Sequence, residues 1–111
     1  MRTLPITVAA DADYPLPGLL TLPDGAGPFP AVLLVHGSGP QDRDEAVGPN
    51  RPFRDLAVGL AALGVASLRY DKRTFAHGKR LADALQGRLS VEEEVIRDAL
   101  CAAALLRAEP L

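Results

Sequence analysis

The stretch Pro30-Ala31-Val32-Leu33-Leu34-Val35-His36-Gly37-Ser38-Gly39-Pro40 decides how the rest of the chain is interpreted. Its five consecutive apolar residues, 31–35, lie between a proline and a glycine-rich turn, a pattern typical of a strand buried on both faces. Gly37 and Gly39 permit backbone angles that residues with a Cβ atom resist. Such a turn can present main-chain N–H groups to an anion or to a developing oxyanion.

The composition predicts one domain without special chemistry. The chain has 111 residues, of which 48% are hydrophobic and 23% charged, as in ordinary globular chains. The formal net charge of −2 gives no indication of nucleic acid or of an anionic membrane as a partner. No apolar stretch approaches the roughly 20 residues that span a bilayer. The absence of a secretory signal pattern favours a cytoplasmic location. The one cysteine, Cys101, excludes an internal disulfide and is expected to be a small buried helix residue.

Two strands are expected before the central strand. Residues 4–9 and 16–22 are β-prone, and turns separate them from each other and from residues 31–35. We therefore expect an antiparallel pair at the N-terminus. Pro17 and Gly18 indicate that the second strand begins as a sheet edge or with a bulge.

A helix and a parallel strand are expected after the central strand. Pro52 suits the first turn of a helix, and Gly64 stands where a C-terminal glycine belongs. The apolar face of this helix is expected to contain Phe53, Leu56, Ala57, Leu60 and Leu63. The next strand should cover residues 65–70. Strand, helix and strand in this order predict a parallel pair with a right-handed crossover.

The C-terminal third is expected to end in a long helix. Residues 72–88 are basic and irregular, with a short helix predicted around residues 80–85. Ser90 and Glu93 then form a capping box for the last helix. Its apolar face is expected to contain Val91, Val95, Ala99, Ala103 and Leu106, widened by Ile96 and Leu100.

Four segments carry a resemblance to a known superfamily: residues 35–44 (VHGSGPQDRD), 49–57 (PNRPFRDLA), 68–74 (LRYDKRT) and 90–99 (SVEEEVIRDA). They resemble the α/β-hydrolase superfamily, closest to its bacterial dienelactone-hydrolase-like and acyl-peptidase-like esterases. The resemblance implies an α/β fold in which an antiparallel N-terminal hairpin leads into a parallel strand–helix–strand unit and a closing helix. It also implies that the strands lie in the spatial order first, second, fourth, third.

The same resemblance implies a serine hydrolase that acts on carboxylic esters through an acyl-serine intermediate, without a cofactor or a metal. The main-chain N–H groups of Ser38 and Gly39 would donate to the oxyanion, and His36 and Gly37 would support this loop. The substrate would be a small-molecule ester or a short peptide.

The nucleophile of that superfamily is missing from this sequence, because no Gly-x-Ser-x-Gly elbow is present. Ser38, Ser67 and Ser90 are expected in the loop, in a strand and at a helix cap. His36 and His77 both precede the point where the elbow would occur. We therefore interpret residues 1–111 as one partial domain, a fragment that supplies the oxyanion loop without the Ser-Asp-His triad and is inactive as given.

Other functions remain open from the residues alone. The parent enzyme could be a serine peptidase of the prolyl-oligopeptidase type, since the two classes differ in the missing region. A chain that is natural as written would instead be a non-catalytic interaction domain, which pairs or self-associates through the exposed edge of its central strand.

Two further site types are less favoured. A nucleotide-binding turn would need glycine where Asp42 stands. The possible metal ligands lack a recognised spacing; they are His36, Asp42, Asp44, Asp71 and His77.

The charged side chains near the turn have simpler interpretations. The run at residues 42–45 is interpreted as a solvated loop with local ion pairs. Asp71, Lys72 and Arg73 are as well explained by pairing with that loop as by solvation. His77 is expected at the surface.

Overall fold

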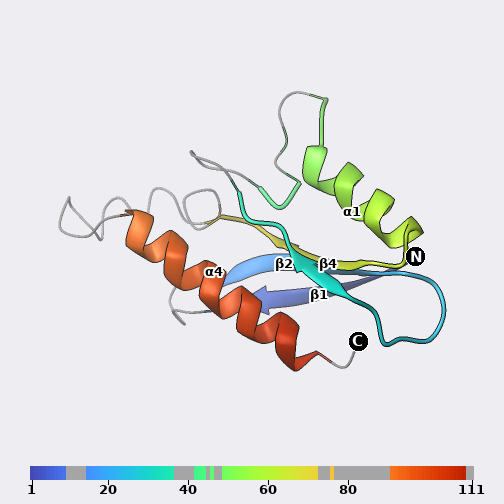
Figure 1. Cartoon of the computed structure of the whole chain (residues 1–111). Coiled ribbons are helices and arrows are strands. Elements are labelled where there is room, and N and C mark those ends of the chain that lie inside the picture. Colours follow the sequence, from blue (N-terminus) through green and yellow to red (C-terminus); the bar gives the residue numbers. More distant parts are fainter. Residues whose placement is uncertain are drawn as a thin grey trace.

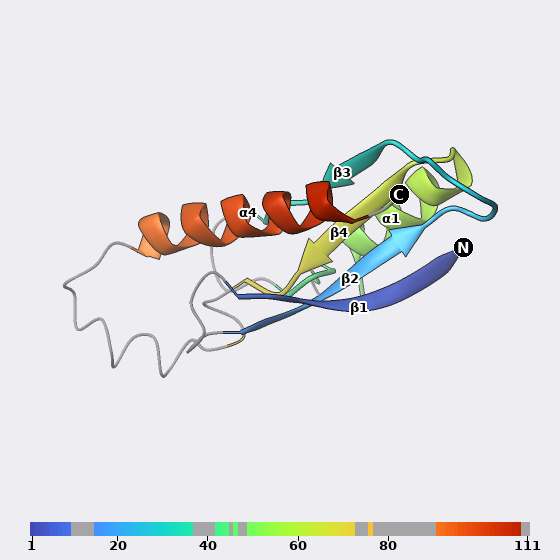
Figure 2. The same ribbon diagram turned by 90° about the horizontal axis from the view of Figure 1, so that it is seen from below.

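The computed structural model describes residues 1–9, 15–36, 42–44, 46, 49–72, 76 and 91–109, with the backbone alone for residues 91–95. The elements are β1 (Arg2–Val8), β2 (Leu16–Leu22), β3 (Ala31–Leu33), α1 (Pro52–Ala62), β4 (Ala66–Tyr70) and α4 (Val91–Ala108). The two helices cover opposite faces of the sheet (Figures 1 and 2). Among the described residues, no helix is both long enough and apolar enough to cross a bilayer. The predicted helix at 80–85 and the capping box at Ser90 lie outside the described side chains.

The four strands form one mixed sheet in the order β1-β2-β4-β3. β2 pairs antiparallel with β1 on one side and with β4 on the other, whereas β3 pairs parallel with β4. The expected order of the strands and the expected parallel pair are confirmed. A mixed sheet with helices on both faces places the chain in the α/β class.

β2 lies inside the sheet, so the predicted edge or bulge at Pro17 and Gly18 was wrong. Its pairing with β1 is continuous, and Gly18 stands opposite Ile6 of β1 and Tyr70 of β4. A Cβ atom on Gly18 would lie 2.9 Å from the main-chain oxygen of Arg69 and 3.2 Å from the Cβ of Tyr70. This glycine therefore marks a close approach to the neighbouring strand rather than a break in pairing.

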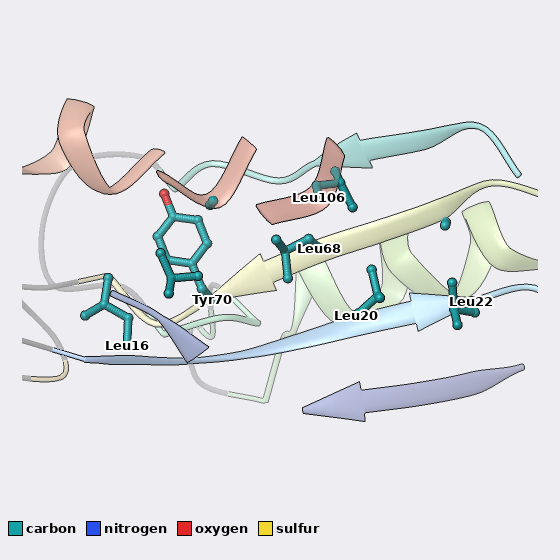
Figure 3. Packing of buried hydrophobic residues seen from close by; sticks show 9 residues of the cluster. Leu16, Leu20, Leu22, Leu68, Tyr70 and Leu106 are labelled. Carbon is teal, nitrogen blue, oxygen red and sulfur yellow. The ribbon is translucent and has the colours of Figure 1, made fainter. Parts of the chain in front are cut away.

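The hydrophobic core lies between the sheet and α4 (Figure 3). Alternate residues of the two central strands share the face toward α4, as the two-residue period of a strand requires. The buried members of this cluster are Val8, Leu16, Leu20, Leu22, Ala66, Leu68, Tyr70, Ala102 and Leu106. Cys101 is half-buried against them, which makes it less enclosed than predicted.

α4 contacts the core through a stripe that agrees with the predicted one only in part: Leu106 is buried as predicted, and Ala99 and Ala103 are half-buried. Ile96 and Leu100, expected on the buried face, are 59% and 66% exposed. The buried series is Asp98, Ala102 and Leu106, with spacing of one residue every helical turn. The prediction failed because Asp98 is charged, and an apolar periodicity therefore could not include the residue that begins this stripe.

α1 begins at Pro52 and is followed by Gly64 at φ +83°, as predicted. Its contact with β2 and β4 uses alanines, since Ala57 and Ala61 are its buried residues. Leu56 and Leu63 are 46% and 81% exposed, so their predicted place in the buried face was wrong. Small side chains bring the helix backbone close to a sheet face that is polar, as described below.

β3 lies at the end of the described sheet, and its predicted burial on both faces was wrong. Its parallel pairing extends beyond the strand, because Ala66 N–H donates to the Pro30 carbonyl at 2.8 Å and Leu34 N–H donates to the Leu68 carbonyl at 3.0 Å. On the strand and just after it, Val32 and Val35 remain 37% and 44% exposed. One neighbouring strand and one covering helix bury only part of an edge strand.

Candidate functional site

The candidate site lies where β3 and β4 end. Because the two strands are parallel, their carboxyl ends meet at the same edge of the sheet. In open α/β sheets this edge is the usual place for ligands. The chain leaves it through His36 after β3 and through Asp71 after β4. Gly37, Ser38 and Gly39 lie outside the described residues, so their predicted roles remain predictions.

His36 is buried at this edge and held by neighbouring elements. Its Nε2 donates to the main-chain carbonyl of Tyr70, since a carbonyl oxygen can only accept. The imidazole stands T-shaped against the Tyr70 ring, with centroids 4.7 Å apart at 87°. The ring of Phe53, in the first turn of α1, lies 6.2 Å away. β4 and α1 together therefore fix the residue that precedes the glycine turn.

Asp71 provides a second connection to the same part of the chain. Its Oδ1 accepts from the main-chain N–H of Arg43 at 2.8 Å, and its own N–H donates to the Pro17 carbonyl at 2.8 Å. Of the two interpretations left open for Asp71, pairing with the polar loop is the one that the structure shows. Lys72 is buried, and Arg73 lies outside the described residues.

The segment after the turn is attached to the sheet and to α1, so its interpretation as a solvated loop was wrong at its two aspartates. Asp42 Oδ1 accepts from the N–H groups of Asp44 and Ala46, at 3.2 and 2.9 Å. Asp44 Oδ1 accepts from Arg69 Nε at 3.0 Å, and the Asp44 carbonyl accepts from Phe53 N–H at 3.0 Å. Glu45 lies outside the described residues.

Polar residues line the face of the sheet that α1 covers. Thr21, Ser67 and Arg69 are buried there, on the opposite face from the hydrophobic core. Arg69 Nη1 donates to Thr21 Oγ1 at 2.9 Å. Sequence reasoning did not single out Arg69 or Thr21. The signal was available, since an arginine inside an otherwise apolar strand must find a partner when it is buried.

Tyr70 is the polar residue of the core face. Figure 3 shows its ring extending from β4 toward α4. Its hydroxyl is buried and has no hydrogen-bond partner within the described structure. Burial, followed by the negative charges of Asp98 and a Cys101 thiolate, raises the pKa of Tyr70 to about 12. The phenol is therefore neutral at ordinary pH.

The described residues contain no cluster of three or more histidine, cysteine, aspartate or glutamate side chains that could hold a metal ion. Of the possible ligands, His36, Asp42, Asp44 and Asp71 hydrogen-bond to protein groups. His77 lies outside the described residues. The side chains of His36, Asp42 and Asp71 therefore bind main-chain groups, whereas that of Asp44 binds the Arg69 side chain.

Comparison with known proteins relates the chain to an esterase over part of that protein's length. No protein-family profile matches the sequence. Over 92 residues, or 83% of the chain, it is 53% identical to a protein named Esterase EstD from Thermotoga maritima. The chain spans 21% of the length of that relative, about one fifth. The similarity thus relates most of this chain to one segment of a longer protein.

Proposed function

We propose that this chain supplies the oxyanion-loop part of a carboxylic-ester hydrolase that works through an acyl-serine intermediate. The observation that carries the proposal is the 53% identity to Esterase EstD over 83% of the chain. Because the chain spans 21% of that relative, the activity of a whole enzyme is itself part of the proposal. An esterase is preferred to a peptidase because the matched protein is named an esterase.

The chemistry requires donors that are held in place before the reaction begins. Attack on an ester carbonyl concentrates negative charge on its oxygen, and each preorganised N–H donor is worth on the order of 3 kcal/mol. In this proposal the donors are the main-chain N–H groups of Ser38 and Gly39, with His36 and Gly37 supporting them. A further donor, from the residue after the nucleophile, and the Ser-Asp-His triad would come from outside residues 1–111.

The position of His36 supports this assignment. Its imidazole is buried and bonded to the Tyr70 carbonyl, which fixes the chain just before the turn at the carboxyl edge of a parallel strand pair. Main-chain donors leave the side chains of the turn free to vary.

A chimera tests the proposal directly. The 92 matched residues of EstD would be replaced by their counterparts from this chain. If the segment from this chain places its main-chain donors as the EstD segment does, the chimera should hydrolyse p-nitrophenyl butyrate with a kcat within about tenfold of EstD, a difference in ΔG‡ of about 1.4 kcal/mol. A folded chimera that does not hydrolyse esters would contradict the proposal.

Two variants of the chimera separate the main chain of Ser38 from its side chain. Ser38→Pro removes the N–H and should lower kcat by about 10²–10³, the usual cost of one oxyanion donor. Ser38→Ala keeps the N–H and should retain activity. Circular dichroism and Tm establish that both variants are folded. Equal activities of the two variants would exclude Ser38 as the donor.

A further inference from the structure

Arg69 is a buried charge whose position needs an explanation. It is 6% exposed and lies near the carboxyl end of β4, on the face that α1 covers. Its guanidinium donates in two directions, to Asp44 at 3.0 Å and to Thr21 at 2.9 Å. Burying such a pair costs desolvation free energy, and apolar residues of similar volume often stabilise a fold as well or better. The arginine is therefore better explained by what it holds in place than by stability.

Asp44 connects Arg69 to the start of α1. The N-terminal N–H groups of a helix have no partner within the helix. The N-cap residue of α1 is Arg51, whose side chain carries donors only and cannot cap them. The Asp44 carbonyl accepts a hydrogen bond from one of these groups, the Phe53 N–H, at 3.0 Å. One aspartate thus links β4 through its side chain to α1 through its main chain.

Asp71, which directly follows β4, also binds the segment that contains Asp44. Asp71 Oδ1 accepts a hydrogen bond from the Arg43 N–H at 2.8 Å. Within the segment itself, Asp42 Oδ1 accepts from the N–H groups of Asp44 and Ala46. His36 lies before residues 37–41 in the sequence, and its Nε2 donates to the main-chain carbonyl of Tyr70, the residue before Asp71. The chain on both sides of residues 37–41 is therefore attached to two consecutive residues, Tyr70 at the end of β4 and Asp71 directly after it.

We propose that Arg69, acting through Asp44, and Asp71, acting through the amide of Arg43, are positioning residues of the candidate site. They fix the positions of Arg43 and Asp44 relative to His36. The chain at both ends of residues 37–41 is thereby held in place. This inference rests on the proposed function, since that function assigns the oxyanion donors to the turn. Neither residue is expected to touch the substrate.

Hydrogen exchange in the 111-residue chain tests the attachment without any activity. Arg69→Met should increase exchange at the Phe53 amide roughly tenfold, as expected when a local opening becomes easier. Asp71→Asn should do the same at the Arg43 amide. Hydrogen exchange at the amides that pair β1 with β2 should stay unchanged. The matched control is Arg54→Met, because among the described residues Arg54 forms only an exposed pair with Asp55, at 3.5 Å.

The kinetic arm uses the EstD chimera and asks whether the attachment matters for the reaction. Arg69→Met should lower kcat by about 10–100-fold with little change in KM, since small displacements of a catalytic group have effects of this size. Arg69→Lys should recover part of the loss by restoring a charge opposite Asp44. Thr21→Val, which removes only the other contact of Arg69, should leave kcat within about twofold. A purely structural role would lower Tm and leave kcat of the folded enzyme unchanged.

The outcomes are distinguishable from failure of the proposed function. An inactive parent chimera would contradict the esterase proposal, and the exchange experiment would still report on the attachment. Unchanged exchange at Phe53 and Arg43 in folded variants would overturn the inference. So would an active chimera whose kcat does not respond to Arg69→Met. If Arg69→Met does not fold, Asp44→Asn replaces it, because this variant removes the charge and keeps the main-chain carbonyl.

Discussion

The imidazole of His36 donates a hydrogen bond to the main-chain carbonyl of Tyr70 and stands perpendicular to the Tyr70 ring. Just after β3, a main-chain bond of the parallel pair runs from Leu34 N–H to the Leu68 carbonyl. Beyond that point a side chain continues the connection between the two strands. The chain after β3 is therefore still attached to β4 where it enters the turn.

Removing this side chain should destabilise the fold measurably. His36→Ala leaves a buried carbonyl without its donor and removes two ring contacts, so we expect a loss of about 2–4 kcal/mol in the free energy of unfolding. His36→Gln keeps a donor and should lose less. Urea unfolding at pH 7 measures both. A His36→Ala variant within about 0.5 kcal/mol of the parent would show that the contact contributes little.

Two glycines should respond in opposite directions to the same substitution. At Gly18 an added methyl would lie 2.9 Å from the Arg69 oxygen and 3.3 Å from Cγ2 of Ile6. Gly18→Ala should therefore cost about 1–3 kcal/mol, as overpacking does. Gly59, inside α1, has open space around its Cβ position. Gly59→Ala should raise stability by about 0.5–1 kcal/mol because alanine favours helix.

Thermal unfolding of the two variants under identical conditions is the comparison. The parent Tm should lie between them. A Gly18→Ala variant as stable as the parent would mean that β2 and β4 can separate slightly without cost, contrary to the close approach described above.

The elements that the sequence predicted well are those with local signals. Proline at the first helical position and glycine beyond the last are local, and Pro52 and Gly64 were predicted correctly. Which face of an element is buried depends on the neighbours it meets. Periodicity therefore misplaced Ile96 and Leu100, and it could not show that Val32 lies on an edge strand. The order of the strands came from the resemblance to a known superfamily.

The contacts of the candidate site could be predicted only in part, because they join residues far apart in the chain. Composition suggested that Asp71 pairs with the charged loop, and it does so through the Arg43 amide. No spacing rule pairs Arg69 with Asp44, since that contact depends on how α1 and the sheet meet. The turn itself lies outside the described residues, so the roles of Ser38 and Gly39 stay predictions.

Replacing a core leucine by alanine should lower the free energy of unfolding far more than replacing a surface leucine. Leu68, on β4, is fully buried in the core between the sheet and α4, whereas Leu63, directly after α1, is 81% exposed. Leu68→Ala should cost about 2–5 kcal/mol through lost transfer free energy and the cavity left behind. Leu63→Ala should change stability by no more than about 0.5 kcal/mol. Denaturant unfolding of both variants measures the contrast. Comparable losses would place the core elsewhere than between the sheet and α4.

The phenol of Tyr70 should make the fold sensitive to alkaline pH. Its pKa is raised to about 12, from an ordinary value near 10, chiefly by burial. Between these values the unfolded chain releases the proton while the folded chain retains it. Stability therefore falls as pH rises from about 10 to about 12, and each unit of pKa difference corresponds to about 1.4 kcal/mol.

Tyr70→Phe isolates this contribution, because the variant lacks the ionisable hydroxyl and keeps the ring. At pH 7 its stability should equal that of the parent or exceed it slightly, since the hydroxyl has no hydrogen-bond partner within the described structure. Above about pH 10 the variant should lose less stability than the parent. Tyr14 is present in both chains, so its titration cancels in the difference. Parallel curves of unfolding free energy from neutral pH to about pH 12 would show that the phenol ionises as freely in the folded chain as in the unfolded one.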